Sequence, residues 1–281
     1  MDMSNALVST DWLAQHLNDR GVVVIDIAGL GQEQLQAYKA GHLPGALAWK
    51  WKDMLWDERR RDFPAPDEFA RRLAAAGIAN DMRVVFYGEP MQFGVYAWWA
   101  FRYCGHENVA ILDGGRKAWA AEGRPLTADV PVPRKPATYR PVARNEGMRI
   151  LRDELIAAVE QGGQFILDGR SPEEYAGQRV GGPGGPDVGA VRPGRIPGAR
   201  HLHYADCLDA LERFKPRAAL QELVAARGVT SAAPVVTYCR MSHRATVLYF
   251  VLTELLGHRD ARVYDGSWTE WGNLVGVPIE K

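Results

Sequence analysis

The sequence has few cysteines, no net charge and no long apolar run. Its 34 basic and 34 acidic residues cancel, which argues against nucleic acid or an anionic membrane as the main partner. No apolar stretch reaches the length of a membrane-spanning helix, and the first residues lack the basic start and apolar segment of a secretory signal. We therefore expect no membrane partner and a cytoplasmic location. The three cysteines, Cys104, Cys207 and Cys239, are too few for a disulfide framework and should be free thiols.

At 281 residues the chain exceeds the usual size of one domain, and an internal repeat indicates two. Asp26 ends the run Val-Val-Val-Ile-Asp, and Asp168 ends the matching run Gln-Phe-Ile-Leu-Asp. The offset between matched residues is 142 here (168 − 26), but it is 153 at Gly45 and Gly198 (198 − 45). The second copy therefore carries 11 extra residues (153 − 142), which fall in the Gly/Pro-rich run 181–194. We expect this insertion to be a loop that acts as a lid or a spacer.

Short apolar, β-branched runs alternate with helical patterns in both copies, which predicts an α/β fold. The runs have the composition of fully buried strands. We predict strands over residues 22–25, 84–87, 165–167 and 235–238. We predict helices over residues 11–17, capped by Ser9 or Thr10, over 68–75, and over 245–256.

These patterns predict two tandem domains, each a mostly parallel sheet with helices on both faces. A segment with many prolines and no periodicity separates the copies and is typical of an extended surface linker. We place the first domain at residues 1–130, the linker at 131–147 and the second domain at 148–281.

The two copies differ most sharply at one position directly after matched strands, which is Gly88 in the first copy and Cys239 in the second. A short loop and an apolar helix follow Cys239. Loop amides and the first helical N–H groups should point at the sulfur, together with the positive end of the helix dipole. Arg240, His243 and Arg244 add cationic side chains. This setting favours the thiolate, which is the nucleophilic form of cysteine.

The alternative for each cysteine is a structural role in the core, because free cysteine is among the most buried residue types. That alternative fits Cys104, which follows an apolar stretch. It does not fit Cys239, because a loop with three potential cations is unsuited to packing. His201, His203 and Cys207 are residues of metal-ligand type, but they lack a fourth partner, and we predict no metal site.

At this point the sequence resembles the tandem-domain rhodaneses over nearly its whole length. The resemblance rests on the six-residue loop that begins at Cys239 and on three further segments. These are Leu167-Asp-Gly-Arg-Ser-Pro-Glu-Glu-Tyr175, the turn Ile196-Pro-Gly-Ala199, and Asp265-Gly-Ser-Trp-Thr-Glu-Trp271. Two positions depart from the pattern, since Arg195 stands where many members have histidine and Glu174 where some thiosulfate-using members carry a cation.

The resemblance implies a sulfurtransferase that needs no cofactor, with an inactive first copy and a catalytic second copy. Cys239 would take the sulfane sulfur of a small anionic donor such as thiosulfate and hold it as a persulfide. A thiophilic acceptor, namely cyanide, a thiol or a thioredoxin-like protein, would then remove it. The residues implied to bind substrate are Arg240, Met241, Ser242, His243, Arg244 and Arg170, with Asp168 and Thr246 in support.

Three other functions stay open. A 3-mercaptopyruvate sulfurtransferase would share the chemistry, but its loop resembles the small, nearly uncharged Cys-Gly-Ser-Gly-Val-Thr, whereas this loop is cationic and suits a dianion. A cysteine-based phosphatase needs five residues between cysteine and arginine, and only four separate Cys239 from Arg244. A non-catalytic binding module fits the first copy better than the second, because only the second has the cysteine loop.

Overall fold

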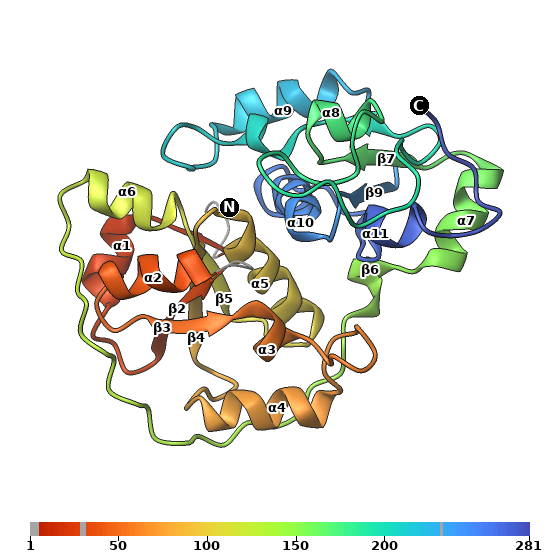
Figure 1. Cartoon of the computed structure of the whole chain (residues 1–281). Helices are drawn as coiled ribbons and strands as arrows, with labels where there is room; N and C mark the ends of the chain where they lie inside the picture. Colours follow the sequence, from red (N-terminus) through yellow and green to blue (C-terminus); the bar gives the residue numbers. More distant parts are fainter. Residues whose placement is uncertain (1–5, 29–31, 231–232) are drawn as a thin grey trace. The chain divides into compact units, whose positions relative to one another are not determined.

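The computed structural model describes residues 6–28, 32–230 and 233–281. Contacts between Cα atoms divide the chain into two compact units, residues 1–146 with 210–213, and residues 147–209 with 214–281. Both are drawn in Figure 1. Within the described ranges, none of the helices combines the length and the apolar character that crossing a bilayer requires.

The first unit is built on a parallel sheet with the strand order β1-β5-β4-β2-β3 among its described residues. The strands are β1 (Leu7–Val8), β2 (Val22–Ala28), β3 (Leu47–Lys50), β4 (Arg83–Gly88) and β5 (Val109–Leu112). The helices are α1 (Thr10–His16), α2 (Gln32–Ala40), α3 (Trp51–Leu55), α4 (Pro66–Ala75), α5 (Gln92–Tyr103) and α6 (Gly115–Ala121).

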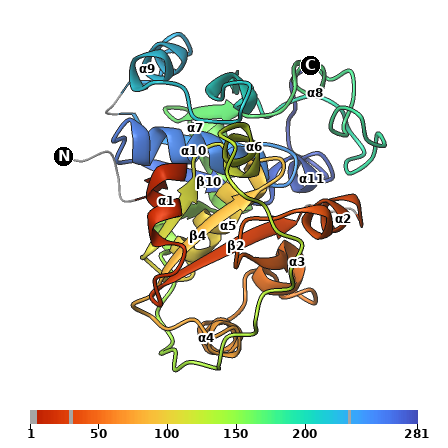
Figure 2. The same ribbon diagram turned by 90° about the vertical axis from the view of Figure 1, so that its left-hand side faces the viewer.

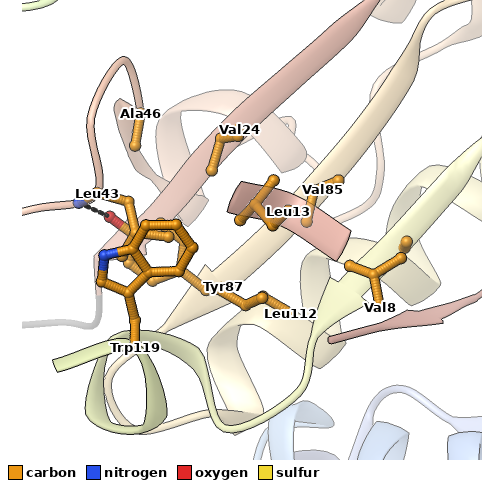
Figure 3. Close-up of a cluster of buried hydrophobic side chains, with 10 residues drawn as sticks. Val8, Leu13, Val24, Leu43, Ala46, Val85, Tyr87, Leu112 and Trp119 are labelled. Carbon is orange, nitrogen blue, oxygen red and sulfur yellow. Dashed lines mark hydrogen bonds between the residues drawn. The ribbon is translucent and has the colours of Figure 1, made fainter. Parts of the chain in front are cut away.

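Helices cover both faces of this sheet (Figures 1 and 2). Tyr87 of β4 packs with Leu13 of α1 and Trp119 of α6 in the buried cluster of Figure 3. Its neighbour Phe86 points to the opposite face, because successive side chains of a strand alternate. There its ring centroid lies 4.7 Å from that of Phe101 in α5. The strands are therefore buried on both sides, which explains their continuous apolar runs.

The second unit repeats this topology, with the parallel strand order β6-β10-β9-β7-β8 in the part of the chain that is described. The strands are β6 (Arg149–Ile150), β7 (Phe165–Asp168), β8 (Arg200–His201), β9 (Val235–Tyr238) and β10 (Ala261–Tyr264). The helices are α7 (Arg152–Gln161), α8 (Pro172–Tyr175), α9 (Arg217–Ala225), α10 (His243–Phe250) and α11 (Ser267–Trp271). Shorter turns are η1 (Glu146–Met148), η2 (Tyr204–Cys207) and the π-helical η3 (Val251–Leu255).

The α/β fold predicted from the sequence is confirmed, and the predicted elements are present, most of them with shifted ends. Ser9 caps α1, since its side chain accepts a hydrogen bond from the Trp12 amide at 3.1 Å. The predicted strand over residues 235–238 is β9. The helix predicted over 245–256 begins earlier, at His243, and changes after Phe250 to the π-helical turn η3.

The segment that we expected to be a linker lies along the first unit. Residues 130–145 contain no helix or strand. The Ala137 amide donates to the Ala74 carbonyl at 2.9 Å, and the buried Tyr139 hydroxyl lies 2.9 Å from Nδ1 of His106. These contacts fasten the segment to the unit that precedes it in the chain.

Asp26, near the end of β2, is a buried carboxylate with weak compensation. It lies opposite Tyr87 in the sheet register and is 9% exposed. Burial raises the pKa of Asp26 to about 7, although the Tyr87 hydrogen bond and the charge of Arg116 oppose the rise, while the charge of Glu89 adds to it. The folded unit therefore holds a proton on Asp26 that the unfolded chain releases at much lower pH.

This pKa predicts that Asp26→Asn stabilises the first unit at alkaline pH. The pKa of Asp26 in the folded protein lies above the unfolded value of about 3.9. The contribution of the Asp26 carboxyl group to the free energy of unfolding is therefore fully present below pH 4 and is lost as the pH rises through 7. The substitution should raise the free energy of unfolding by about 4 kcal/mol at pH 8 and by about 1.5 kcal/mol at pH 5. Urea unfolding at both pH values measures this, with the exposed Asp129→Asn as the control. An equal gain at both pH values would contradict the prediction.

Candidate functional site

The candidate site lies at the carboxyl end of β9, which is the central strand of the second sheet. Cys239 directly follows β9 and is 1% exposed. The chain then turns through Arg240, Met241 and Ser242 into α10. Ser242 has a φ of 73°, a left-handed conformation that non-glycine residues rarely adopt. The carboxyl end of a parallel strand is where such sheets place their ligands.

The hydroxyl of Ser267 holds the two ends of this loop. Its Oγ accepts hydrogen bonds from the amides of Cys239 and Ser242, both at 3.2 Å, and donates to the Tyr264 carbonyl at 2.9 Å. Oγ of Ser242 lies 2.5 Å from Oδ1 of Asp265 and 2.6 Å from its carbonyl oxygen. Ser242, Asp265 and Ser267 are all buried. The loop is therefore fixed by two side chains, that of Asp265 in the turn after β10 and that of Ser267 at the start of α11.

This arrangement leaves the amino end of α10 directed at the loop without a side-chain cap. Ser242 is the N-cap residue, but its side chain makes no capping hydrogen bond because it binds Asp265 instead. The Thr246 amide donates to the Ser242 carbonyl, and the Thr246 hydroxyl donates to the His243 carbonyl, both at 2.9 Å. The earlier N–H groups of a helix have no acceptor within it, and with the helix dipole they favour negative charge near Cys239.

Of the two loop arginines, Arg244 is paired with a carboxylate. Its Nη1 and Nη2 lie 2.6 and 2.8 Å from the two oxygens of Glu174, which is fully buried. Glu174 in turn forms a capping box with Ser171 at the start of α8. Burial by itself would lower the pKa of Arg244, but the Glu174 hydrogen bond and the charge of Cys239 outweigh it and raise that pKa. Arg244 thus remains charged, and Glu174 offsets much of its field.

Arg240 has a different partner, a neutral carbonyl in the insertion. Its Nη2 donates to the Val188 carbonyl at 2.7 Å. Among the residues that the structure describes, no carboxylate lies within ion-pair distance of the Arg240 guanidinium. Arg240 is therefore the loop cation whose charge is least compensated.

Asp168 and Arg170 form a pair buried at 0% exposure. Nη2 of Arg170 lies 2.6 Å from Oδ2 of Asp168, and it also donates to the Gly194 carbonyl at 2.8 Å. Tyr238 donates its hydroxyl to the same Asp168 oxygen at 2.5 Å, and the guanidinium lies 4.6 Å from the Trp268 ring centroid. Since Arg170 is fully buried and paired with Asp168, we interpret it as a positioning residue, and the substrate-binding role that the resemblance implied stays a prediction.

The other predicted residues lie on the same loop and helix. Met241 is half-buried, and His243 and Thr246 are buried at the start of α10. Among the described residues, His201 and Cys207 have other surroundings. Nε2 of His201 is 2.8 Å from the Arg170 carbonyl, and burial raises the pKa of the Cys207 thiol to about 12. No group of three or more metal-ligand side chains occurs within the described ranges.

Two residues that shape the loop, Asp265 and Ser267, were not singled out from the sequence, although their motif was. The repeat could have pointed to Ser267. When Asp113 of the first copy is matched with Asp265 of the second, Gly115 is matched with Ser267 at the same offset (267 − 115 = 152), so the two copies differ there. The first copy thus lacks both the cysteine and the hydroxyl that holds the loop.

The first copy also lacks room for a nucleophile at the equivalent position. Gly88 ends β4 as Cys239 follows β9. A Cβ atom at Gly88 would lie 2.9 Å from the Gly94 amide nitrogen and 3.0 Å from the Ile27 carbonyl oxygen. Both neighbours are backbone atoms, so a side chain there would require the chain to move.

Comparison with known proteins agrees with this geometry. The rhodanese-like domain family matches residues 9–122 and 151–274. The sulfur carrier protein TtuD of Thermus thermophilus is 42% identical over 279 residues, which cover 98% of this chain and 96% of that protein. A protein of Saccharopolyspora erythraea named "Putative thiosulfate sulfurtransferase" is 40% identical over 281 residues, covering 100% and 98%.

Solved structures share the fold at lower identity. The Tum1 protein of Saccharomyces cerevisiae has a TM-score of 0.81 at 19% identity, covering 95% of this chain and 94% of its own. The anaerobic ergothioneine biosynthesis enzyme of Chlorobium limicola has a TM-score of 0.85 at 22% identity, covering 100% of this chain and 71% of its own. With a family match in each half and relatives about 40% identical along their whole length, the chain belongs to the rhodanese family and carries two rhodanese-like domains in tandem.

Proposed function

We propose that the protein is a thiosulfate sulfurtransferase that carries the transferred sulfur on Cys239 as a persulfide. The observation that carries the proposal is the setting of Cys239. It lies directly after the central strand, in a loop held by Ser267, and before a helix whose N-cap residue makes no capping hydrogen bond with its side chain. Sulfurtransferase activity is also in the names of relatives about 40% identical to this chain.

In the first half-reaction the Cys239 thiolate attacks the outer sulfur of thiosulfate. A sulfur–sulfur bond forms to Cys239, the bond within thiosulfate breaks, and sulfite leaves with the electron pair. Arg240 binds the anionic donor and stabilises the charge that develops on the leaving sulfite. Arg244, whose charge Glu174 offsets, contributes less to donor binding. The amino end of α10 stabilises the persulfide anion that remains.

In the second half-reaction a nucleophilic acceptor attacks the outer sulfur of the persulfide, and the Cys239 thiolate is regenerated. With cyanide the product is thiocyanate, and with a thiol it is a new persulfide. One relative is named a sulfur carrier protein, which supports an acceptor that is itself a thiol or a protein thiol. The cycle needs no cofactor, because the sulfane sulfur keeps its oxidation level in both steps and each leaving group takes the electron pair of the sulfur–sulfur bond that breaks.

We further propose the domain boundaries that follow from the repeat. Residues 1–130 form the non-catalytic first domain, residues 131–147 the linker and residues 148–281 the catalytic second domain. Gly88, where a Cβ atom would meet backbone atoms, supports the non-catalytic role of the first domain. A cytoplasmic location stays a prediction.

The proposal predicts a clear preference among sulfur donors. Steady-state transfer to cyanide should be faster with thiosulfate than with 3-mercaptopyruvate, because Arg240 suits a dianion. p-Nitrophenyl phosphate should not be hydrolysed, since only four residues separate Cys239 from Arg244. A preference for mercaptopyruvate would move the protein to that sister activity, and phosphatase turnover without sulfur transfer would overturn the proposal.

The matched pair for that assay is Cys239→Ser and Cys104→Ser. Serine at 239 should abolish transfer from every donor, because its hydroxyl cannot hold a sulfane sulfur. Serine at 104 should leave transfer nearly intact, because Cys104 lies buried in the first unit, at the end of α5. Comparable losses in both variants would refute a single nucleophile.

The Glu174 ion pair predicts opposite changes in stability and donor binding. Glu174→Gln leaves Arg244 without its counter-charge, which should lower the free energy of unfolding by about 3 kcal/mol. The uncompensated Arg244 should also lower the KM for thiosulfate. Chemical denaturation and donor kinetics measure the two effects, with Glu173→Gln on the exposed side of the same turn as the control. If the two variants behaved alike, Glu174 would not moderate the charge of Arg244.

A further inference from the structure

The insertion of the second copy makes a close contact with Arg240. Residues 181–194 contain no helix or strand. The Val188 carbonyl accepts a hydrogen bond from Nη2 of Arg240. The next residue, Gly189, has a φ of 119°, and a Cβ atom there would lie 3.0 Å from Nη2 and 3.1 Å from Nε of Arg240. The guanidinium thus packs on a position that only glycine suits.

The parts of the insertion before and after Val188 are held by hydrogen bonds within the second unit. Oδ1 of Asp187 accepts from the amides of Val180 and Gly181 at 2.7 and 2.8 Å. Asn273 donates to the Gly189 carbonyl at 3.0 Å and accepts from the Val191 amide at 2.9 Å. Further along the insertion, the Arg192 guanidinium donates to the carbonyls of Trp271, Leu274 and Val277. These bonds favour a fixed support over a mobile lid.

The electrostatics single out Arg240 as the group that the insertion controls. Its hydrogen-bond partner is a neutral carbonyl, and its buried Nε has no acceptor among the residues that the structure describes. The pKa of the nearby Asp187 is lowered mainly by hydrogen bonds from the amides of Gly181 and Val180. The positive charge of Arg240 contributes little to that shift, so Asp187 compensates Arg240 only weakly. The insertion therefore holds the guanidinium in place while leaving most of its charge and donors for an anion.

We propose that the insertion is a specificity element for the sulfur donor. In this proposal Gly189 and the Val188 carbonyl form a seat that orients the Arg240 guanidinium for a dianionic donor. The inference rests on the proposed function of the Cys239 loop and adds to it a positioning role for residues that are distant from the loop in sequence. It makes Gly189 a positioning residue, and it makes Arg240 the residue through which Gly189 acts.

The test compares two glycines of the same insertion. Gly189→Ala should displace the guanidinium, whereas Gly182→Ala is the control, since a Cβ atom there would meet no atom within 4 Å and its φ is not positive. Thiosulfate binding is measured by calorimetry in the Cys239→Ser background, which cannot react. We expect Gly189→Ala to weaken binding about tenfold, the loss of one charge-assisted contact, and Gly182→Ala to leave it unchanged. In proteins with Cys239, kcat/KM for thiosulfate should fall by at least the same factor, because Arg240 contacts both the bound donor and the leaving sulfite.

Because alanine at a φ of 119° can also strain the loop, both glycine variants are repeated with Arg240→Ala. If Gly189 acts through Arg240, its effect on binding disappears in that background. A tenfold loss that persists without Arg240, equal binding by the two glycine variants, or no thiosulfate binding by the parent protein would each overturn the inference. Normal turnover with equal binding would refute the inference alone, while the expected binding pattern without any sulfur transfer would refute the proposed function alone.

Discussion

The candidate site depends on one hydroxyl group, that of Ser267. It accepts hydrogen bonds from the backbone amides of Cys239 and Ser242, at the two ends of the cysteine loop. Through these two hydrogen bonds the start of α11 sets the conformation of the turn after β9, including the left-handed Ser242. Asp265 reinforces it by binding the Ser242 side chain and by pairing with Arg149 at 3.0 Å. A sharp six-residue turn could not keep one shape alone, because its own backbone supplies too few internal hydrogen bonds.

Charge around the loop is divided between two arginines with unlike partners. Glu174 makes Arg244 part of the packing between α8 and α10, where it helps hold the helix. Arg240 donates a hydrogen bond to a carbonyl oxygen, which carries no full charge, so the positive charge of Arg240 is less compensated. The departure noted in the sequence, an acidic residue at position 174, therefore has a structural meaning. It offsets the charge of Arg244, and in the proposed function it leaves binding of the anionic donor mainly to Arg240.

The two-domain fold and the position of Cys239 could be predicted from the sequence, because the two copies of the repeat are easily matched. The strands are buried on both faces and so appear as apolar runs, and the comparison of copies isolates Cys239 against Gly88. The sequence left open whether Arg170 pairs with Asp168 or contacts a donor, because a cation after a strand has the same sequence pattern in both cases. Contacts across long sequence separations, such as Val188 with Arg240, leave no local signal at all.

The first copy has glycine at both positions that correspond to Cys239 and Ser267, and this has an evolutionary consequence. Gly88 ends β4, whereas Gly115 lies after β5, and a Cβ atom at Gly88 would meet backbone atoms. A duplicated fold can lose such a site in one substitution, whereas regaining it would require a nucleophile, a hydroxyl and a displaced backbone together. Each intermediate would bring no activity for selection to retain. The asymmetry between the two halves of this chain is therefore expected to be one-way.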